Sequence, residues 1–383
     1  MTSITQLHKI WQLAWAMLIH NRLRLLFTVL GVATAFLLAA TQFGLLVGWT
    51  NTNTALITHA KADLWIVAKQ TPSWDFGTEI PRQLIYRVRN IEQVAWSRGL
   101  IVVWSNWQRP DGRYVSISLV GLDQDEVGGP WQLQQGSLDV IHQPQTVLVD
   151  ELYLPLLQVQ KLGDTAQILG SRAVVGGISQ GIRTFTASPH VFTSIEQAIR
   201  YDGRYRDDEV TYVLIRCRAG ANVQAVQAAL REQIKDVEIL TSDEFAMRSA
   251  GYWMLETGAG ITVIITAILG LLVGAVITSQ TLFATTQEHL QNYATLLAVG
   301  FERRVLSQVV IMQSLLIGFA GILVGGILFI PAAWLSARTP IPLELTPLVS
   351  MGLIMLFLVT CLLASILSLR SVFQLDPVVV FSQ

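Results

Sequence analysis

The sequence contains four long apolar stretches that carry almost no charged residues. The second and third are free of Asp, Glu, Lys and Arg from Thr257 to Gln287 and from Val305 to Ala337. A helix needs about 20 apolar residues to cross the hydrocarbon core of a bilayer, and backbone groups in lipid must be bonded within their own segment. The sequence therefore predicts an α-helical membrane protein with four transmembrane helices, within residues 23–50, 257–284, 305–335 and 346–369.

The first stretch could instead be a cleaved signal peptide, because Ala33-Thr34-Ala35 has the small-x-small form of a cleavage site. The apolar run continues to Val47, further than a cleavable segment needs. We therefore expect an uncleaved membrane anchor.

Composition agrees with a membrane location. Of the 383 residues, 52% are hydrophobic and 14% are charged, whereas soluble domains carry about 25% charged residues. The net charge of −1 gives no reason to expect a nucleic-acid partner. Cys217 lies in the polar region and Cys361 in an apolar stretch, so we expect no disulfide.

Residues 51–256 are polar and contain turn signals such as Arg109-Pro110-Asp111-Gly112. A region of about 200 residues can bury a hydrophobic core. The patterns predict strands at 63–68, 100–107, 114–120, 146–149, 210–216 and 237–240, and helices at 82–89, 194–199 and 223–234. We expect a large extracytoplasmic α+β domain of two lobes, inserted between helices 1 and 2.

Residues 1–22 have the spacing of an amphipathic helix that lies at the membrane surface or extends the first span. Its apolar positions are Ile4, Leu7, Trp11, Ala14, Trp15 and Leu18.

The distribution of basic residues predicts the orientation. The N-terminal segment has Lys9, Arg22 and Arg24, the connector before the third span has Arg303 and Arg304, and Arg370 follows the fourth span. The short loop 336–345 has only Arg338. We therefore expect both termini, including the tail 370–383, and the connector 285–300 to be cytoplasmic.

The connector 285–300 reads as a separate short helix. Thr285 or Thr286 has the chemistry of an N-cap, Glu288 suits a helix start, and Gly300 suits the position after the last turn. Its apolar positions share one face at helical spacing: Leu290, Tyr293, Ala294 and Leu297. Such a face can dock into a partner's groove, or pack against the membrane or the N-terminal helix; spacing alone does not separate these.

The sequence shows no catalytic, metal or cofactor motif. It contains no P-loop, H-E-x-x-H, C-x-x-C or G-x-S-x-G pattern, and its six histidines lack metal-ligand spacing. We interpret Asp207-Asp208-Glu209 as a solvated loop. Spans without ionisable groups other than Cys361 argue against an ion-coupled transporter.

Three G-x-x-x-G pairs lie in the apolar stretches and permit close packing of helices, within the chain or across a dimer. They are Gly44/Gly48, Gly270/Gly274 and Gly321/Gly325. In the polar region, Trp96, Trp104, Trp107 and Trp131 are expected in the core or in contact with an apolar cargo or adaptor.

Four motifs carry a family resemblance. They are EHLQNYATLLAVG (288–300), LDPVVVF (375–381), LTSDEF (240–245) followed by Tyr252-Trp253, and ADLWIV (62–67). In these motifs the chain resembles the MacB/FtsX-type permeases of ABC exporters, and most closely the cyanobacterial DevC type. It departs from the family pattern at Gln291, Asn292 and Leu297, where charged residues are common.

The resemblance implies a homodimeric, non-catalytic permease of the plasma membrane, with its large domain in the periplasm. It implies a separate ABC ATPase that binds ATP and Mg²⁺, a periplasmic membrane-fusion adaptor and a TolC-like outer-membrane protein. The connector would be the coupling helix, with Glu288, Leu290, Tyr293, Ala294, Leu297 and Gly300, and the cytoplasmic C-terminal motif would include Leu375, Asp376 and Pro377. The cargo would be a glycolipid or another amphiphile.

Two alternatives remain open from the sequence. One is a permease that releases lipoproteins or regulates cell-wall hydrolases, in the manner of LolC or FtsX. The other is a membrane-anchored receptor or scaffold without an ATPase. A neighbouring gene for a P-loop ATPase would exclude the second alternative, and one for an adaptor would exclude the first.

Overall fold

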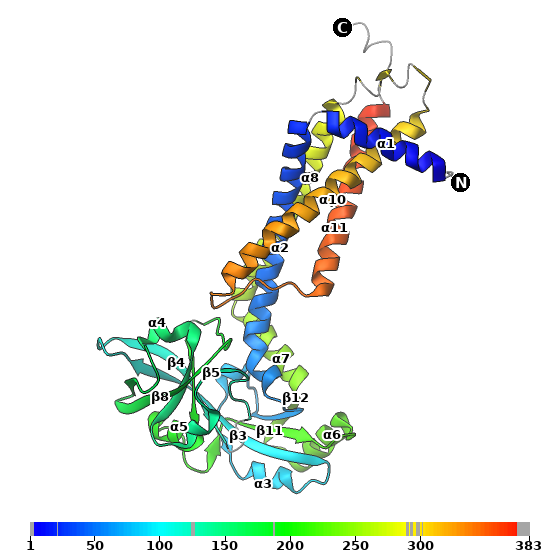
Figure 1. Cartoon of the computed structure of the whole chain (residues 1–383). Coiled ribbons are helices and arrows are strands. Elements are labelled where there is room, and N and C mark those ends of the chain that lie inside the picture. The colour runs from blue at the N-terminus through cyan, green and yellow to red at the C-terminus, as the bar shows by residue number, and fades with distance from the viewer. Residues whose placement is uncertain are drawn as a thin grey trace. The chain divides into compact units, whose positions relative to one another are not determined.

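The computed structural model describes residues 4–20, 22–123, 127–186, 188–288, 291, 294–295, 299–300 and 302–373. The chain divides into two compact units, whose elements are shown in Figure 1. Unit 1 consists of Met1–Gly48, Thr262–Ala337 and Pro342–Gln383, and unit 2 of Trp49–Ile261 and Arg338–Ile341.

Long apolar helices build unit 1. They are α1 (Ile4–His20), α2 (Arg22–His59), α8 (Ala259–Glu288), α10 (Arg303–Ser336) and α11 (Pro347–Phe373). Within the described residues, four segments are long and apolar enough to cross a membrane: Leu25–His59, Gly260–Glu288, Arg303–Ser336 and Pro347–Ile366. By length and composition, these segments coincide with the four apolar stretches of the sequence.

Helix α2 is longer than its apolar stretch. It continues through polar residues to His59, and its last turns, from Trp49 onward, belong to unit 2. This part of the sequence has no glycine or proline, and its threonine hydroxyls donate to helix carbonyls, as Thr54 Oγ1 does to Thr50 O at 3.2 Å.

The predicted start of a separate helix at Thr285 or Thr286 is wrong. Both residues lie inside α8, which continues to Glu288. An N-cap needs non-helical backbone angles, and nothing in the sequence around these threonines breaks the helix. The side chain of Thr286 is buried.

Helix α1 has apolar residues on two faces, of which one packs against another helix. Ile10, Ala14 and Leu18 are buried, and the first two form a cluster with Leu306 and Val309 of α10. Trp11 and Trp15 are instead about two-fifths exposed, and their rings stack on each other. Spacing could not separate the two faces, because apolar residues occupy both sides of this helix.

Unit 2 contains a ten-stranded sheet in the order β12-β1-β11-β3-β4-β9-β6-β8-β5, with β7 paired to β3 and β8. The strands are β1 (Leu64–Ala68), β3 (Val94–Gln108), β4 (Tyr114–Leu122), β5 (Leu133–Gln135), β6 (Thr146–Asp150), β7 (Thr165–Ile168), β8 (Ser171–Ser179), β9 (His190–Ser194), β11 (Tyr212–Cys217) and β12 (Val237–Thr241). Two short strands, β2 (Ile80–Pro81) and β10 (Glu209–Val210), pair separately.

The long strand β3 belongs to both halves of the sheet (Figure 1). Its first half pairs with β11, and its end pairs with β7. The pairing path β3-β4-β9-β6-β8-β7 returns to β3, so these strands close on themselves and leave no free edge between them. The other half contains β12, β1 and β11, the last followed by α6 (Val223–Gln233) and then β12, as the predicted strand-helix-strand order required.

Each predicted strand and helix of this region is found, but β2, β5, β7, β8 and β9 were not predicted, nor were the helices at Leu154–Leu157 and Ser242–Gly251. Strand β8 contains Gly176 and Gly177, which are unfavourable in strands. A Cβ on Gly177 would lie 2.5 Å from Leu148 of the neighbouring β6, so the close pairing itself requires glycine. That requirement is invisible without the neighbouring strand.

Side chains of the sheet alternate between two cores. Ile101 and Val103 of β3 face a core that is covered by α3 (Leu84–Arg89) and α5 (Ile195–Asp202). Leu100 and Val102 face the other core, which contains Ile57 from the end of α2 and Phe245 of α7 (Ser242–Gly251). This second face carries the residues described next.

Candidate functional site

An aromatic cluster connects the segment Tyr252–Glu256, which precedes α8, to the face of the sheet that carries Leu100 and Val102. We call it the aromatic clasp, and it consists of Phe76, Trp104, Phe185, Tyr252 and Trp253. The ring centroids of Phe185 and Trp253 are 4.5 Å apart, and those of Phe76 and Trp253 are 5.8 Å apart. Trp49 of α2 joins the clasp through Phe185 at 5.7 Å.

Trp253 is the member of the clasp that contacts the most distant parts of unit 2 in sequence. Its Nε1 donates to Asp75 Oδ2 at 3.0 Å and to Ser73 Oγ at 3.2 Å. From the sheet, Trp104 Nε1 donates to the backbone oxygen of Asp75 at 3.0 Å. The short helix η1 (Trp74–Phe76) therefore lies between β3 and Trp253 and is bonded to both.

Asp75 is a buried carboxyl in this site. Its side chain is 6% exposed, and burial raises its pKa to about 6, although the hydrogen bonds from Trp253 and Ser73 oppose the rise. No lysine or arginine forms an ion pair with Asp75 among the described residues. The protonation state of Asp75 therefore changes near the lower end of the physiological range.

A row of side chains extends from the clasp across the sheet. Trp104 is paired with Ser118, and Ser118 with His190, so the three residues share one face. His190 lies against the Trp74 ring at 5.2 Å, and burial lowers its pKa to about 3. His190 is therefore neutral at neutral pH and acts as a packing residue.

Helix α7 is fixed at both ends. At its start, Thr241 Oγ1 accepts from Glu244 N and Glu244 Oε2 accepts from Thr241 N, which is a capping box. Near its end, Ser249 Oγ accepts from Trp74 N at 3.1 Å. The motif LTSDEF contains the T-x-x-E pattern of a capping box, which is the sequence signal for this helix start.

A π-helix follows α7 and carries Tyr252 and Trp253. It comprises Tyr252–Glu256, and Thr257 N donates to Tyr252 O, five residues back. Gly258 then has φ +76°, and α8 begins at Ala259. π-Helical turns are rare and concentrate at functional positions. The aromatic clasp thus sits on an irregular turn immediately before a long apolar helix.

The six predicted packing glycines all lie at close approaches within unit 1. Gly321 and Gly325 of α10 face α2, where a Cβ on Gly325 would lie 2.7 Å from Ala33 O. Gly270 and Gly274 of α8 also face α2, at Gln42 and Ala35. Gly44 lies against Phe329 and Gly48 against the backbone of Pro342. Helix α2 is therefore the common partner of α8 and α10 in a single chain.

Few of the predicted coupling residues can be placed. Glu288 ends α8, Ala294 is buried, and Gly300 has φ +99°, which suits a chain reversal after a helix. Leu290, Tyr293 and Leu297 lie outside the described residues, as do Leu375, Asp376 and Pro377 of the C-terminal motif. Their roles stay predictions.

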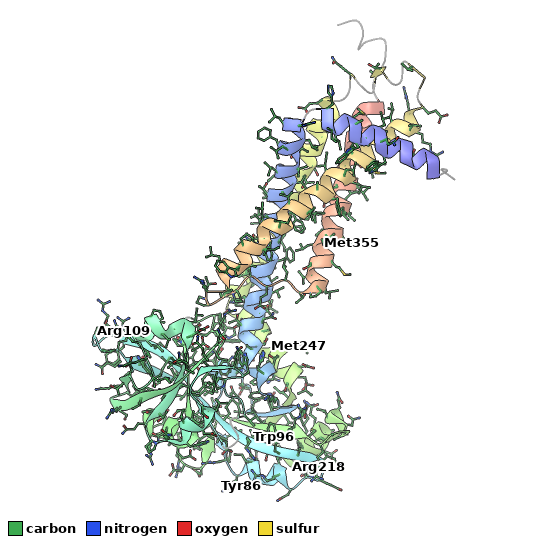
Figure 2. The ribbon with its side chains drawn as sticks, in the orientation of Figure 1. Tyr86, Trp96, Arg109, Arg218, Met247 and Met355 are labelled. Carbon is green, nitrogen blue, oxygen red and sulfur yellow. The ribbon has the colours of Figure 1, made fainter. Side chains whose placement is uncertain are left out.

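The four tryptophans have different surroundings. Trp107 is fully buried and donates to Leu157 O at 3.2 Å, and Trp131 stacks on His59 at 4.0 Å. Trp96, labelled in Figure 2, packs against the second core, whereas Trp104 belongs to the clasp. Among the described residues, no group of three or more His, Cys, Asp or Glu is placed to hold a metal ion.

These features define a membrane-embedded protein with a large mixed α/β domain that is continuous in sequence with apolar helices. Comparison with protein families assigns it further. The model of the MacB-like periplasmic core domain matches residues 25–233, and that of the FtsX-like permease C-terminal region matches residues 264–377. The chain therefore belongs to the MacB/FtsX-like permease family of ABC transporters, whose members are generally non-catalytic, membrane-embedded subunits with a periplasmic domain.

Solved structures resemble part of the chain. The periplasmic region of MacB from Actinobacillus actinomycetemcomitans is 14% identical, with a TM-score of 0.39, over 48% of this chain and 89% of that one. The extracellular domain of the noncanonic ABC-type transporter YknZ from Gram-positive bacteria is 10% identical, with a TM-score of 0.37, over 47% of this chain and 98% of that one. No curated protein sequence matches the chain.

Proposed function

We propose that this chain is the permease subunit of an ATP-driven tripartite exporter of the DevC type. It forms a homodimer and pairs with a separate ABC ATPase, a periplasmic membrane-fusion adaptor and a TolC-like outer-membrane protein. Both termini and the connector 285–300 are cytoplasmic. The cargo is a glycolipid or another amphiphile, which the periplasmic domain expels as it moves.

The observation that carries this proposal is the double hydrogen bond of Trp253 to Asp75 and Ser73. Trp253 lies six residues before α8, and Asp75 is bonded to β3 through Trp104. We therefore expect a displacement of the chain at the start of α8 to move the sheet as well, through the side chains of Trp253, Asp75 and Trp104. Family membership supports the ABC ATPase and the adaptor as partners.

The packing of the apolar helices also favours transmission of motion over a polar pore. Close glycine contacts bring α8 and α10 against α2. Residues 259–287 of α8 and 305–336 of α10 include no Asp, Glu, Lys or Arg. Spans without ionisable side chains lack the groups that line ion and proton pathways, and their close packing favours movement of the helices together.

The test first looks for genes of a P-loop ATPase and a membrane-fusion adaptor beside the gene of this chain, and then expresses the full-length chain with their products. The variant Leu290→Ala/Tyr293→Ala/Leu297→Ala should lose co-purification of the ATPase and lose export. The variant Trp253→Phe should keep the ATPase but export less, because only the link to the sheet is weakened. Unchanged ATPase binding and export in the triple variant would refute the proposal. Export without any adaptor would favour a lipoprotein-releasing permease.

A further inference from the structure

An apolar groove of about 440 Å³ opens on the surface of unit 1. Its walls come from α2, α10 and α11, and its lining includes Phe36, Ile322, Gly326, Phe329, Ser350 and Leu353. The edge-to-face pair of Phe36 and Phe357, with ring centroids 5.2 Å apart, supports the side formed by α2 and α11.

Gly326 differs from the other glycines of α10. Gly318, Gly321 and Gly325 each lie against a residue of another helix, whereas a Cβ on Gly326 would meet nothing within 4 Å. Glycine in a helix interior is less favourable than alanine, and here no contact within the chain requires it. The absence of a side chain at this position deepens the groove.

The residues around Gly326 show whether the groove fits a helix of a second copy or a narrow apolar group. Helix pairs that approach through glycine need a second small residue one turn away. One turn from Gly326, in both directions, stand Ile322 and Ile330, with Leu323 and Phe329 beside them. Leu323 and Ile330 are more than half exposed, so they project on either side of the glycine. The surface at Gly326 is therefore a narrow notch, wide enough for a hydrocarbon chain. It is not the flat surface on which a helix of a second copy would pack.

The position of the groove along the helices also fits a lipid chain. From Phe319 to Ile330 the lining of α10 spans about 16 Å at a rise of ~1.5 Å per residue. That is roughly half of the ~30 Å hydrocarbon core, the depth of one leaflet. Ser350 is the polar side chain among the lining residues, and it lies in the first turn of α11, at the end of a candidate span.

We propose that this groove binds one acyl chain of a bilayer phospholipid, with the lipid head group at the level of Ser350. The chain lies along Gly326 toward the middle of the bilayer. This site is independent of the exporter role: it follows from the shape and composition of unit 1, whatever the protein transports.

The test reconstitutes the full-length protein in phospholipid nanodiscs with a phosphatidylethanolamine that carries a photoreactive diazirine on one acyl chain. In the wild type, crosslinks should concentrate on the peptides around residues 319–330 and 350–354. Gly326→Leu, which fills the notch, should reduce labelling of these peptides at least fivefold. Gly352→Leu is the matched control, because Gly352 also faces open space but does not line the groove, and it should leave labelling unchanged.

Two results would overturn the proposal. One is even labelling of all exposed apolar faces, such as that of Met355 on α11 (Figure 2), with no concentration at the groove. The second is unchanged labelling in Gly326→Leu. If that variant with unchanged labelling also loses its dimer, measured by light scattering, the notch belongs to the interface with a second copy. If Gly326→Leu does not fold, Gly326→Ala should fold and reduce labelling about twofold.

Discussion

The indole Nε1 of Trp253 donates a hydrogen bond of 3.0 Å to Oδ2 of Asp75, although the two residues are 178 positions apart in the sequence. This contact connects the π-helix before α8 to the segment that lies on β3. Because Asp75 is buried, the contact depends on both the indole and the charge state of the carboxyl. The first two predictions concern these two properties.

Asp75 should make stability depend on pH between about 4 and 6. Its pKa is raised from 3.8 to about 6 in the folded protein, so the folded state holds the proton more tightly than the unfolded state. Stability from this group is therefore greatest below pH 3.8 and is lost as pH rises to about 6. A shift of about two pKa units corresponds to about 3 kcal/mol.

The measurement is the unfolding midpoint of the full-length protein in nanodiscs from pH 4 to 7, for the wild type and Asp75→Asn. The contribution of this residue is the difference between the two profiles, since other groups also titrate. A difference that does not change with pH would show that Asp75 is not the group responsible.

Trp253→Phe should destabilise unit 2 by about 1–3 kcal/mol, because it leaves the buried Asp75 carboxyl and Ser73 hydroxyl without their indole donor. The phenyl ring keeps most of the aromatic contacts. Trp131→Phe serves as the comparison, since Trp131 stacks on His59 and takes no part in the clasp. Equal losses of stability in urea unfolding of the two variants would contradict the assigned role of Trp253.

Gly325→Ala should destabilise the helices of unit 1 by about 1–3 kcal/mol. Its new methyl group would lie 2.7 Å from the backbone oxygen of Ala33, which cannot move without shifting α2. Gly352→Ala should be neutral or slightly stabilising, because no atom lies within 4 Å of the new methyl group. Thermal unfolding in detergent, followed by circular dichroism, compares the two; equal midpoints would show that α2 and α10 do not pack as described.

Thr241→Ala should cost about 0.5–2 kcal/mol, since it removes the side-chain oxygen that accepts from Glu244 N at the start of α7. Ser242→Ala tests a different bond, from Trp65 Nε1 to Ser242 Oγ at 3.1 Å. Hydrogen exchange of the amide of Glu244 should quicken in Thr241→Ala and stay slow in Ser242→Ala. Slow exchange in both variants would mean that the capping box contributes little.

Much of the architecture could be predicted because it depends on local composition. Length and lack of charge were sufficient to locate the four apolar segments, and alternation of side chains located strands such as β4 and β11. The G-x-x-x-G spacing identified glycines that do lie at close helix contacts. The spacing could not show which helix each pair of glycines contacts. That α8 and α10 both pack on α2 depends on the shapes of the surfaces of all three helices.

The aromatic clasp could not be predicted. Phe76, Trp104, Phe185 and Trp253 come from separate parts of the sequence, and each alone has the pattern of an ordinary turn, strand or helix residue. The pair Tyr252-Trp253 was noted as part of a family motif, but its partners were not. Likewise, the periodicity of residues 1–22 did not show which apolar positions meet another helix. Helix α10 packs on Ile10 and Ala14, and Trp11 and Trp15 stay exposed.

The amino-acid sequence thus suffices to locate the long apolar segments, the polar region between the first two of them, and about half of the strands in that region. These properties depend on the free energy of moving short segments out of water, which is a sum over neighbouring residues. The closed path of β-strands, the contacts of α2 and the bond between Trp253 and Asp75 depend on which surfaces meet in three dimensions. They arise only when segments distant in the sequence pack together, because each contact depends on the shapes of two segments and not on the composition of either one.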